Sequence, residues 1–128
     1  MLSAKEIKVM VKRTQGKESL RQKQSRACLM HSYLIQYAFE QGYELTDGDA
    51  YRDPRAFGEL GEKGAYGAKS SCHKLRLARD YNLFLGGKWL NKSSEFEALG
   101  VFWESIGGSW GGRWGDGNHF SVEHNGHR

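Results

Sequence analysis

The chain has 128 residues, of which 38% are hydrophobic and 27% are charged, and it contains 17 glycines but a single proline. This length supports one hydrophobic core, and the composition excludes a disordered chain, a collagen-like repeat and a coiled coil. The net charge of +4 comes from the N-terminus, because residues 1–26 hold eight Lys or Arg and two Glu, whereas the rest of the chain is slightly acidic.

Residues 1–26 are predicted to form a basic, helical N-terminal region. Its cations could bind an anionic wall polymer, an anionic membrane surface or nucleic acid, since binding to any polyanion releases counterions. A solvated helix face is an equally good interpretation, because Gln, Ser and Thr interrupt the charges and no aromatic residue lies among them for base stacking. We therefore expect no specific nucleic-acid partner.

No segment is typical of a membrane span or a secretory signal. The longest nearly apolar stretch, residues 29–39, is interrupted by polar side chains and is shorter than the roughly 18 residues that cross a bilayer. The first residues lack the charged start, apolar middle and cleavage site of a signal peptide. We expect a protein without a transmembrane segment that at first stays inside the cell, with Cys28 and Cys72 as free thiols.

Residues 18–41 are predicted to form the main helix, because apolar side chains recur along them at helical spacing and Gly42 follows where a helix would stop. A short strand is expected at residues 43–46, and a Gly-rich loop at residues 54–67. Residues 75–90 are predicted to form a β-hairpin that turns at two glycines, Gly86 and Gly87.

The C-terminal third is predicted to contain a second helix and several short strands. Ser94 and Glu97 have the spacing of a capping box, and the apolar residues that follow recur at helical spacing as far as Gly107. Residues 109–127 combine Trp, Phe and Val with glycines, which is typical of short strands joined by turns. This order of elements, with no repeat or linker, predicts one small α+β domain with two or three helices packed on a sheet.

Histidines and acidic residues gather in the second half of the chain, where they could bind a metal. His73 and Asp80 are seven residues apart, and in a turn followed by a strand both can point to one place. Asp116 lies three residues before His119, so the imidazole could bind the metal while the carboxylate accepts a proton from the attacking water. Three ligands would leave the open fourth position of a catalytic zinc site. Spacing alone is weak evidence, because scattered His and Asp residues fit many such arrangements.

Two further groups of residues are candidates for the site. His124 follows Glu123 and competes with His119 as a ligand, but Ser121 rather than an acid lies three residues before it. Trp110 and Trp114 lie on either side of a glycine pair and are candidates for the wall of a substrate groove.

The segment from Ser71 to Asp80 resembles the Ser-x-His-x-x-Gly-x-Ala-x-Asp signature of the zinc D-alanyl-D-alanine carboxypeptidase family, which includes vancomycin-resistance dipeptidases and phage L-alanyl-D-glutamate endolysins. Four of the five fixed positions match, and the exception is Arg76 at the glycine position. A strand-like backbone would accept arginine there as well as glycine. The pair Asp116 and His119 resembles the endolysin version, in which an Asp lies three residues before the last His ligand.

The resemblance covers residues 40–124, which we predict to be the catalytic part of the chain, and it implies an antiparallel sheet that carries a zinc site. It implies three zinc ligands and one catalytic base: His73, Asp80 and His119 as the ligands, and Asp116 as the base. Arg52 resembles a family arginine that binds the substrate carbonyl and stabilises the oxyanion. A salt bridge to a neighbouring Asp is an equally good interpretation of this arginine.

The activity that the resemblance implies is zinc-dependent hydrolysis of peptidoglycan stem peptides, by an L-alanyl-D-glutamate endopeptidase of phage endolysin type or by a D,D-carboxypeptidase. Such an endolysin would wait as a monomer in the host cytoplasm until lysis and then act on the cell wall. Two alternatives stay open on the residues themselves. One is a metal-dependent nuclease that uses the basic N-terminus and the His-rich tail, and the other is a non-catalytic module that binds the cell wall or nucleic acid.

Overall fold

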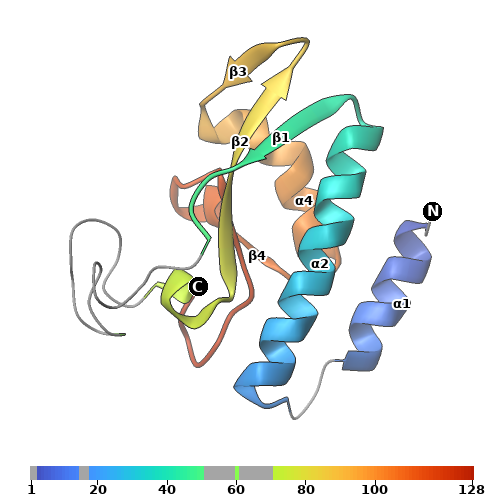
Figure 1. The fold of residues 1–128 in the computed structure, drawn as a ribbon, viewed down its shortest axis with the longest axis vertical. Helices are drawn as coiled ribbons and strands as arrows, with labels where there is room; N and C mark the ends of the chain where they lie inside the picture. Colours follow the sequence, from blue (N-terminus) through green and yellow to red (C-terminus); the bar gives the residue numbers. More distant parts are fainter. Residues whose placement is uncertain (1–2, 15–17, 51–59, 61–70) are drawn as a thin grey trace.

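Three α-helices and a five-stranded antiparallel sheet form the part of the chain that the structure, a computed structural model, describes: residues 3–14, 18–50, 60 and 71–128 (Figure 1). In chain order the elements are α1 (Ala4–Thr14), α2 (Leu20–Glu40), β1 (Tyr43–Asp47), the 3-10 helix η1 (Cys72–Leu75), β2 (Ala78–Leu85), β3 (Lys88–Leu90), the 3-10 helix η2 (Ser93–Phe96), α4 (Glu97–Ser105), β4 (Ser109–Trp110), the 3-10 helix η3 (Gly111–Trp114) and β5 (His119–Ser121). No helix within these residues is long and apolar enough to cross a lipid bilayer. The predicted Gly-rich loop at residues 54–67 lies outside the described residues, except for residue 60.

The helix α2 has a recognisable cap at each end. Ser19 Oγ accepts a hydrogen bond from the Gln22 backbone N–H at 3.1 Å, and the Gln22 side chain accepts one from the Ser19 N–H at 2.9 Å. At the other end Gly42 has a φ of 89°, a left-handed conformation that favours glycine and ends the helix. The predicted main helix is therefore confirmed, as is the strand that follows it, β1.

The strand β2 is central to the sheet, in which the strand order is β1-β2-β5-β4 and β3 also pairs with β2. The predicted hairpin is confirmed as β2 and β3, with Leu85 paired to Lys88. Gly86 and Gly87 form its turn with φ values of 57° and 78°. A two-residue type I′ turn requires positive φ at both positions, which glycine adopts without steric cost.

Arg76, between η1 and β2, does not have the strand-like backbone that the sequence predicted. Its φ of 58° and ψ of 32° are left-handed, a conformation that costs a residue with a Cβ about 1–2 kcal/mol. Position 76 therefore has the backbone expected of the glycine in the family signature, although it carries arginine. The first strand of the hairpin consequently begins at Ala78 rather than at Leu75, which lies in η1.

The second predicted helix is present, but it begins as the 3-10 turn η2 and continues as α4. The expected capping pair, Ser94 and Glu97, does not cap it. Instead the Lys92 backbone N–H donates to Glu95 Oε1 at 3.1 Å, two residues earlier in the chain. The buried side of α4 is the predicted apolar one and includes Leu99, Phe102 and Trp103.

The hydrophobic core lies between the sheet and the helices α2 and α4. The ring of Trp103 in α4 lies 6.0 Å from the ring of Phe120 in β5 and 4.5 Å from that of His31 in α2. Tyr81 of β2 faces α2, since its hydroxyl lies 2.6 Å from His31 Nδ1. One face of the sheet is thus covered by helices, and the predicted α+β class is confirmed.

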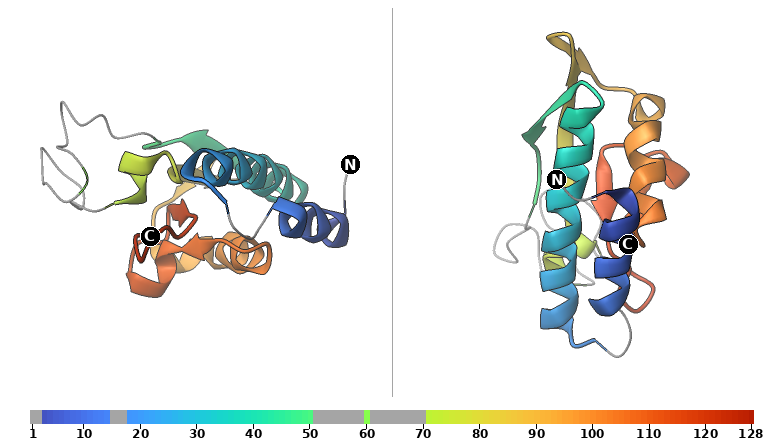
Figure 2. Two further views of the ribbon diagram at one scale, coloured as in Figure 1. Left: turned by 90° about the horizontal axis from the view of Figure 1, so that it is seen from below. Right: turned by 90° about the vertical axis from the view of Figure 1, so that its right-hand side faces the viewer.

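The described residues of the basic N-terminal region include α1 and the first turns of α2. The helix α1 packs on α2 through buried Ile7 and Val11, and it lies on the side of α2 that is farther from β1 and β2 (Figures 1 and 2). Four of the cations on α1 are exposed: Lys5, Lys8, Lys12 and Arg13.

The two cysteines are free thiols, as predicted from the sequence. Cys28 is exposed on α2, whereas Cys72 is buried in η1. Burial raises the pKa of the Cys72 thiol to about 12, so this group stays protonated and behaves as a small core side chain.

Candidate metal centre

A cross-strand pair of residues, Asp80 and His119, forms the base of the candidate site. The antiparallel pairing of β2 with β5 sets Asp80 directly opposite His119, so the two side chains lie on the same face of the sheet. The next residue in each strand, Tyr81 or Phe120, faces the helices. Since side chains alternate along a strand, Asp80 and His119 point to the opposite face. His119 Nδ1 lies 3.4 Å from Asp80 Oδ1.

The 3-10 helix η1 brings His73 to this pair. Ser71 caps η1, because its Oγ accepts a hydrogen bond from the His73 backbone N–H at 3.2 Å. His73 Nε2 lies 3.1 Å from Asp80 Oδ1 and 3.2 Å from His119 Nδ1. The three side chains offer ligand atoms that all lie within 4.8 Å of one another, and this group could hold a metal ion.

The hydrogen bonding of His73 favours a metal at this point. Its Nδ1 lies 2.7 Å from the Ala50 carbonyl oxygen, which can only accept, so Nδ1 carries the ring hydrogen. In the neutral imidazole, Nε2 then presents a lone pair toward the oxygen of Asp80. Two lone pairs at such a distance repel each other unless a cation lies between them, and a carbonyl partner on the second nitrogen is typical of metal-binding histidines. The donor set of two His and one Asp therefore fits zinc.

The charge of Asp80 is also suited to a cation. In the metal-free protein, burial by itself would raise the pKa of this carboxyl group, but the two histidine rings, when protonated, donate hydrogen bonds to it and place positive charge beside it, which lowers the pKa to about 2. Asp80 is therefore a carboxylate at neutral pH. His73 and His119 are almost fully buried, and the Asp80 side chain is 13% exposed, so the three groups have little contact with bulk water.

Asp116 lies beside the cluster, but in contact with solvent. Its Oδ2 is 3.9 Å from His119 Nδ1, and its side chain is 51% exposed. The turn before β5 sets this position, because the Asp116 N–H donates to the Gly111 carbonyl and the Asp116 carbonyl accepts from the His119 N–H. A half-exposed carboxylate next to buried ligands can exchange protons with water at the site.

Two residues that sequence reasoning did not single out hold the Asp116 turn. Ser93 Oγ accepts a hydrogen bond from the Gly117 N–H at 2.9 Å and donates one to the Gly115 carbonyl at 3.2 Å, so it binds the backbone on both sides of Asp116. Gly111 lies against the same turn, where a Cβ would collide with the Asp116 carbonyl oxygen. No short motif contains these contacts, since Ser93 and Gly117 are 24 residues apart.

A cavity of about 250 Å³ adjoins Asp116. Its lining includes the half-exposed Trp89 of β3 and three asparagines: Asn82, Asn91 and Asn118. No Lys or Arg lines it, and Asp116 is its one charged residue among the described parts of the chain. Side-chain amides can pair with the N–H and C=O groups of a peptide or of an acetamido group. No pattern in the sequence indicates this cavity, because its lining comes from separate strands and turns.

The remaining candidates from the sequence have different positions. His124 Nδ1 lies 3.1 Å from Lys23 Nζ and outside the metal-binding cluster. Trp110 is buried and donates its indole N–H to the Gly117 carbonyl at 2.7 Å, so its expected place in a groove wall is wrong. Trp114 is 37% exposed, with its ring 5.7 Å from that of His119. Arg52 lies outside the described residues.

Comparison with known proteins points to the same class of site. A family model described as D-alanyl-D-alanine carboxypeptidase matches residues 65–122, a stretch that contains the three clustered residues and Asp116. No curated protein is significantly similar to the chain. The match supports a metallopeptidase of the peptidoglycan carboxypeptidase type in preference to a nuclease or a non-catalytic module.

Proposed function

We propose that this chain is a zinc-dependent peptidoglycan peptidase that hydrolyses bonds of the stem peptide. The observation that carries the proposal is the convergence of ligand atoms from His73, Asp80 and His119 within 4.8 Å of one another, with the Asp116 carboxylate beside them. The family match over residues 65–122 supports the same activity.

The roles of the residues follow from their chemistry. Zinc held by His73, Asp80 and His119 would polarise the scissile carbonyl and make water more acidic. Asp116 accepts the proton of the attacking water at its exposed carboxylate and returns it to the leaving amine nitrogen. Arg52 binds the substrate carbonyl and stabilises the negative charge that develops on its oxygen.

The proposed substrate is the stem peptide, cut either between L-alanine and D-glutamate or at the terminal D-alanine. The cavity next to Asp116 supports a peptide substrate, because asparagines line it and no Lys or Arg of the described residues does. The endolysin subtype rests on the resemblance of Asp116 and His119 to the phage enzymes. By the same resemblance the protein is a monomer that stays in the host cytoplasm until lysis and then acts on the cell wall.

The test is to incubate zinc-loaded protein with purified peptidoglycan and to identify the new chain ends by mass spectrometry. A new amino group on D-glutamate indicates the endopeptidase, and free D-alanine indicates the carboxypeptidase. Asp116→Asn should retain zinc by elemental analysis but lose about 100- to 10,000-fold in kcat. Asp47→Asn, at an exposed carboxylate on β1, is the matched control and should keep full activity. Full activity in Asp116→Asn, or active protein without bound zinc, would contradict the proposal.

A further inference from the structure

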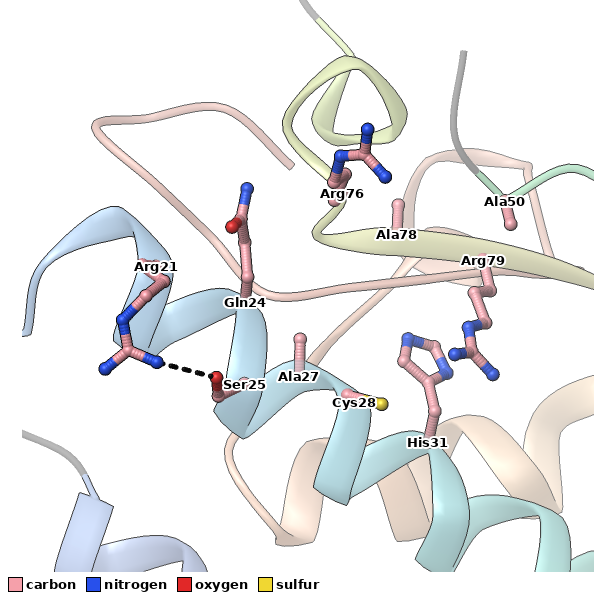
Figure 3. Close-up of a pocket in the computed structure, with 10 residues that line it drawn as sticks. All are labelled: Arg21, Gln24, Ser25, Ala27, Cys28, His31, Ala50, Arg76, Ala78 and Arg79. Carbon is pink, nitrogen blue, oxygen red and sulfur yellow. Dashed lines mark hydrogen bonds between the residues drawn. The ribbon is translucent and has the colours of Figure 1, made fainter. Parts of the chain in front are cut away.

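A second, larger cavity of about 420 Å³ lies between α2 and the start of β2 (Figure 3). Its lining includes three arginines, Arg21 from α2 and Arg76 and Arg79 from the β2 side, together with Gln24. No carboxylate lines it among the described residues. The guanidinium group of Arg21 donates a hydrogen bond to Ser25 Oγ at 3.4 Å, and that of Arg79 lies beside His31 (Figure 3). Each guanidinium group can donate several hydrogen bonds to an oxyanion.

His31 supplies a buried donor to the same cavity. It is 2% exposed, and its Nε2 has no hydrogen-bond partner among the described residues. Figure 3 shows the ring projecting from α2 toward β2, beside the side chain of Arg79. A buried polar atom without a partner is costly, which points to a group that the cavity would bind.

The hydrogen bond between Tyr81 and His31 determines which His31 nitrogen carries the hydrogen. Burial raises the pKa of Tyr81 well above its ordinary value, so the hydroxyl keeps its hydrogen. We assign the hydroxyl hydrogen to the bond with His31 Nδ1, which is 2.6 Å long. Burial, reinforced by the charge of Arg79, lowers the pKa of His31 to about 3, so the ring is neutral at pH 7. The remaining hydrogen is then on Nε2, which must find an acceptor.

We propose that this cavity binds an oxyanion, the phosphate or carboxylate group of a small molecule or chain segment, which accepts hydrogen bonds from His31 Nε2–H and from the surrounding arginines. The volume lies within the range of small-molecule sites. The cavity is separate from the metal centre but adjoins it, because Ala50 lines the cavity and its carbonyl binds His73. Arg76, which lines the cavity, has a left-handed and therefore strained backbone. Strained residues are common at binding sites.

The proposal is tested by NMR on the zinc-loaded protein, titrated with inorganic phosphate and, separately, with glutarate at pH 7 and constant ionic strength. The side-chain nitrogen and proton signals of His31 should shift in a saturable way with at least one of the two anions. The anion that binds identifies the oxyanion as a phosphate or a carboxylate. Failure of both anions to produce a saturable shift at millimolar concentrations would overturn the proposal.

Two exposed arginines provide a matched pair of variants. Arg21→Gln removes a cavity cation and should weaken binding about tenfold, whereas Arg13→Gln removes an equal charge from α1 and should leave it unchanged. Equal losses in both would contradict a local site. Asp80→Asn, which removes a candidate zinc ligand, should retain anion binding, and loss of the His31 shift there would mean that the anion binds at the metal centre instead.

Discussion

Asp80 is the residue whose ionisation couples the candidate metal centre to the stability of the fold. Its folded-state pKa of about 2 lies below the ordinary value of 3.8. The ionised group therefore stabilises the native state at pH values above the ordinary pKa, and this stabilisation is lost as the pH falls through the folded pKa. The shift corresponds to about 2 kcal/mol for this largely buried carboxylate.

The prediction is that Asp80→Asn lowers the free energy of unfolding of the metal-free protein by about 2 kcal/mol near pH 5. The loss should shrink as the pH is lowered toward the folded pKa, because the wild-type carboxylate becomes protonated as well. Urea unfolding of both proteins over a series of pH values measures this difference in the free energy of unfolding. Glu44→Gln, at an exposed carboxylate on β1, is the control. A loss in Asp80→Asn that does not change with pH would contradict the assignment.

Arg76 allows the backbone cost of a left-handed residue to be measured directly. Replacing it with glycine or with alanine removes the same side-chain interactions, but alanine keeps the steric penalty at φ 58°. Arg76→Gly should therefore be more stable to unfolding than Arg76→Ala by about 1 kcal/mol. Thermal and urea unfolding of the two variants provide the comparison. Equal stability would mean that position 76 is not left-handed in solution.

The turn between η3 and β5 is the element that sets the distance between Asp116 and His119. Ser93 Oγ is hydrogen-bonded to the backbone on both sides of Asp116. Ser93→Ala should lower the free energy of unfolding by about 1 kcal/mol. It should also lower kcat for stem-peptide hydrolysis, because the Asp116 carboxylate is no longer held in place. Zinc affinity should not change, because the variant leaves all three candidate ligands in place. Ser94→Ala, at the exposed neighbouring serine, is the matched control, and an equal loss of kcat there would refute a positioning role for Ser93.

Elements defined by local patterns could be predicted from the sequence. The paired glycines Gly86 and Gly87 specify the hairpin, because few other residues accept positive φ at both turn positions. The helix α2 was predictable from its apolar spacing and from Gly42 at its end. The family resemblance was needed to predict that His119 lies beside His73 and Asp80. The spacing of His and Asp residues alone is compatible with many possible metal sites.

Features that depend on contacts between distant segments could not be predicted. The carbonyl group that orients His73 belongs to the backbone of Ala50, 23 residues away. Every residue has a backbone carbonyl, so the sequence does not indicate which one contacts His73. The left-handed backbone at Arg76 follows from the path of the chain between η1 and β2, not from any preference of arginine. The burial of Trp110 depends on α4, whose Gly100 leaves room for the indole ring.

At the scale of the whole molecule, the metal centre and the basic helix α1 lie on different sides. The candidate ligands point to the face of the sheet opposite the helices, and α1 packs on the side of α2 that is farther from β1 and β2 (Figure 1). The charges on α1 therefore cannot touch a small substrate at the metal centre. They can still attract an extended polyanion such as a cell-wall polymer.

The prediction is that a variant with Gln at all four exposed cations of α1 adsorbs less to purified cell walls at low salt, while kcat/KM on a small soluble stem peptide stays within about twofold. Adsorption of the wild type should fall as salt is added, and that of the variant should depend on salt much less. The four positions are Lys5, Lys8, Lys12 and Arg13.

A pair of double variants tests whether the position of the charges matters. Lys8→Gln with Lys12→Gln should weaken adsorption more than Lys88→Gln with Lys92→Gln, which removes the same charge from another part of the surface. Equal effects would mean that net charge, and not the face of α1, governs adsorption.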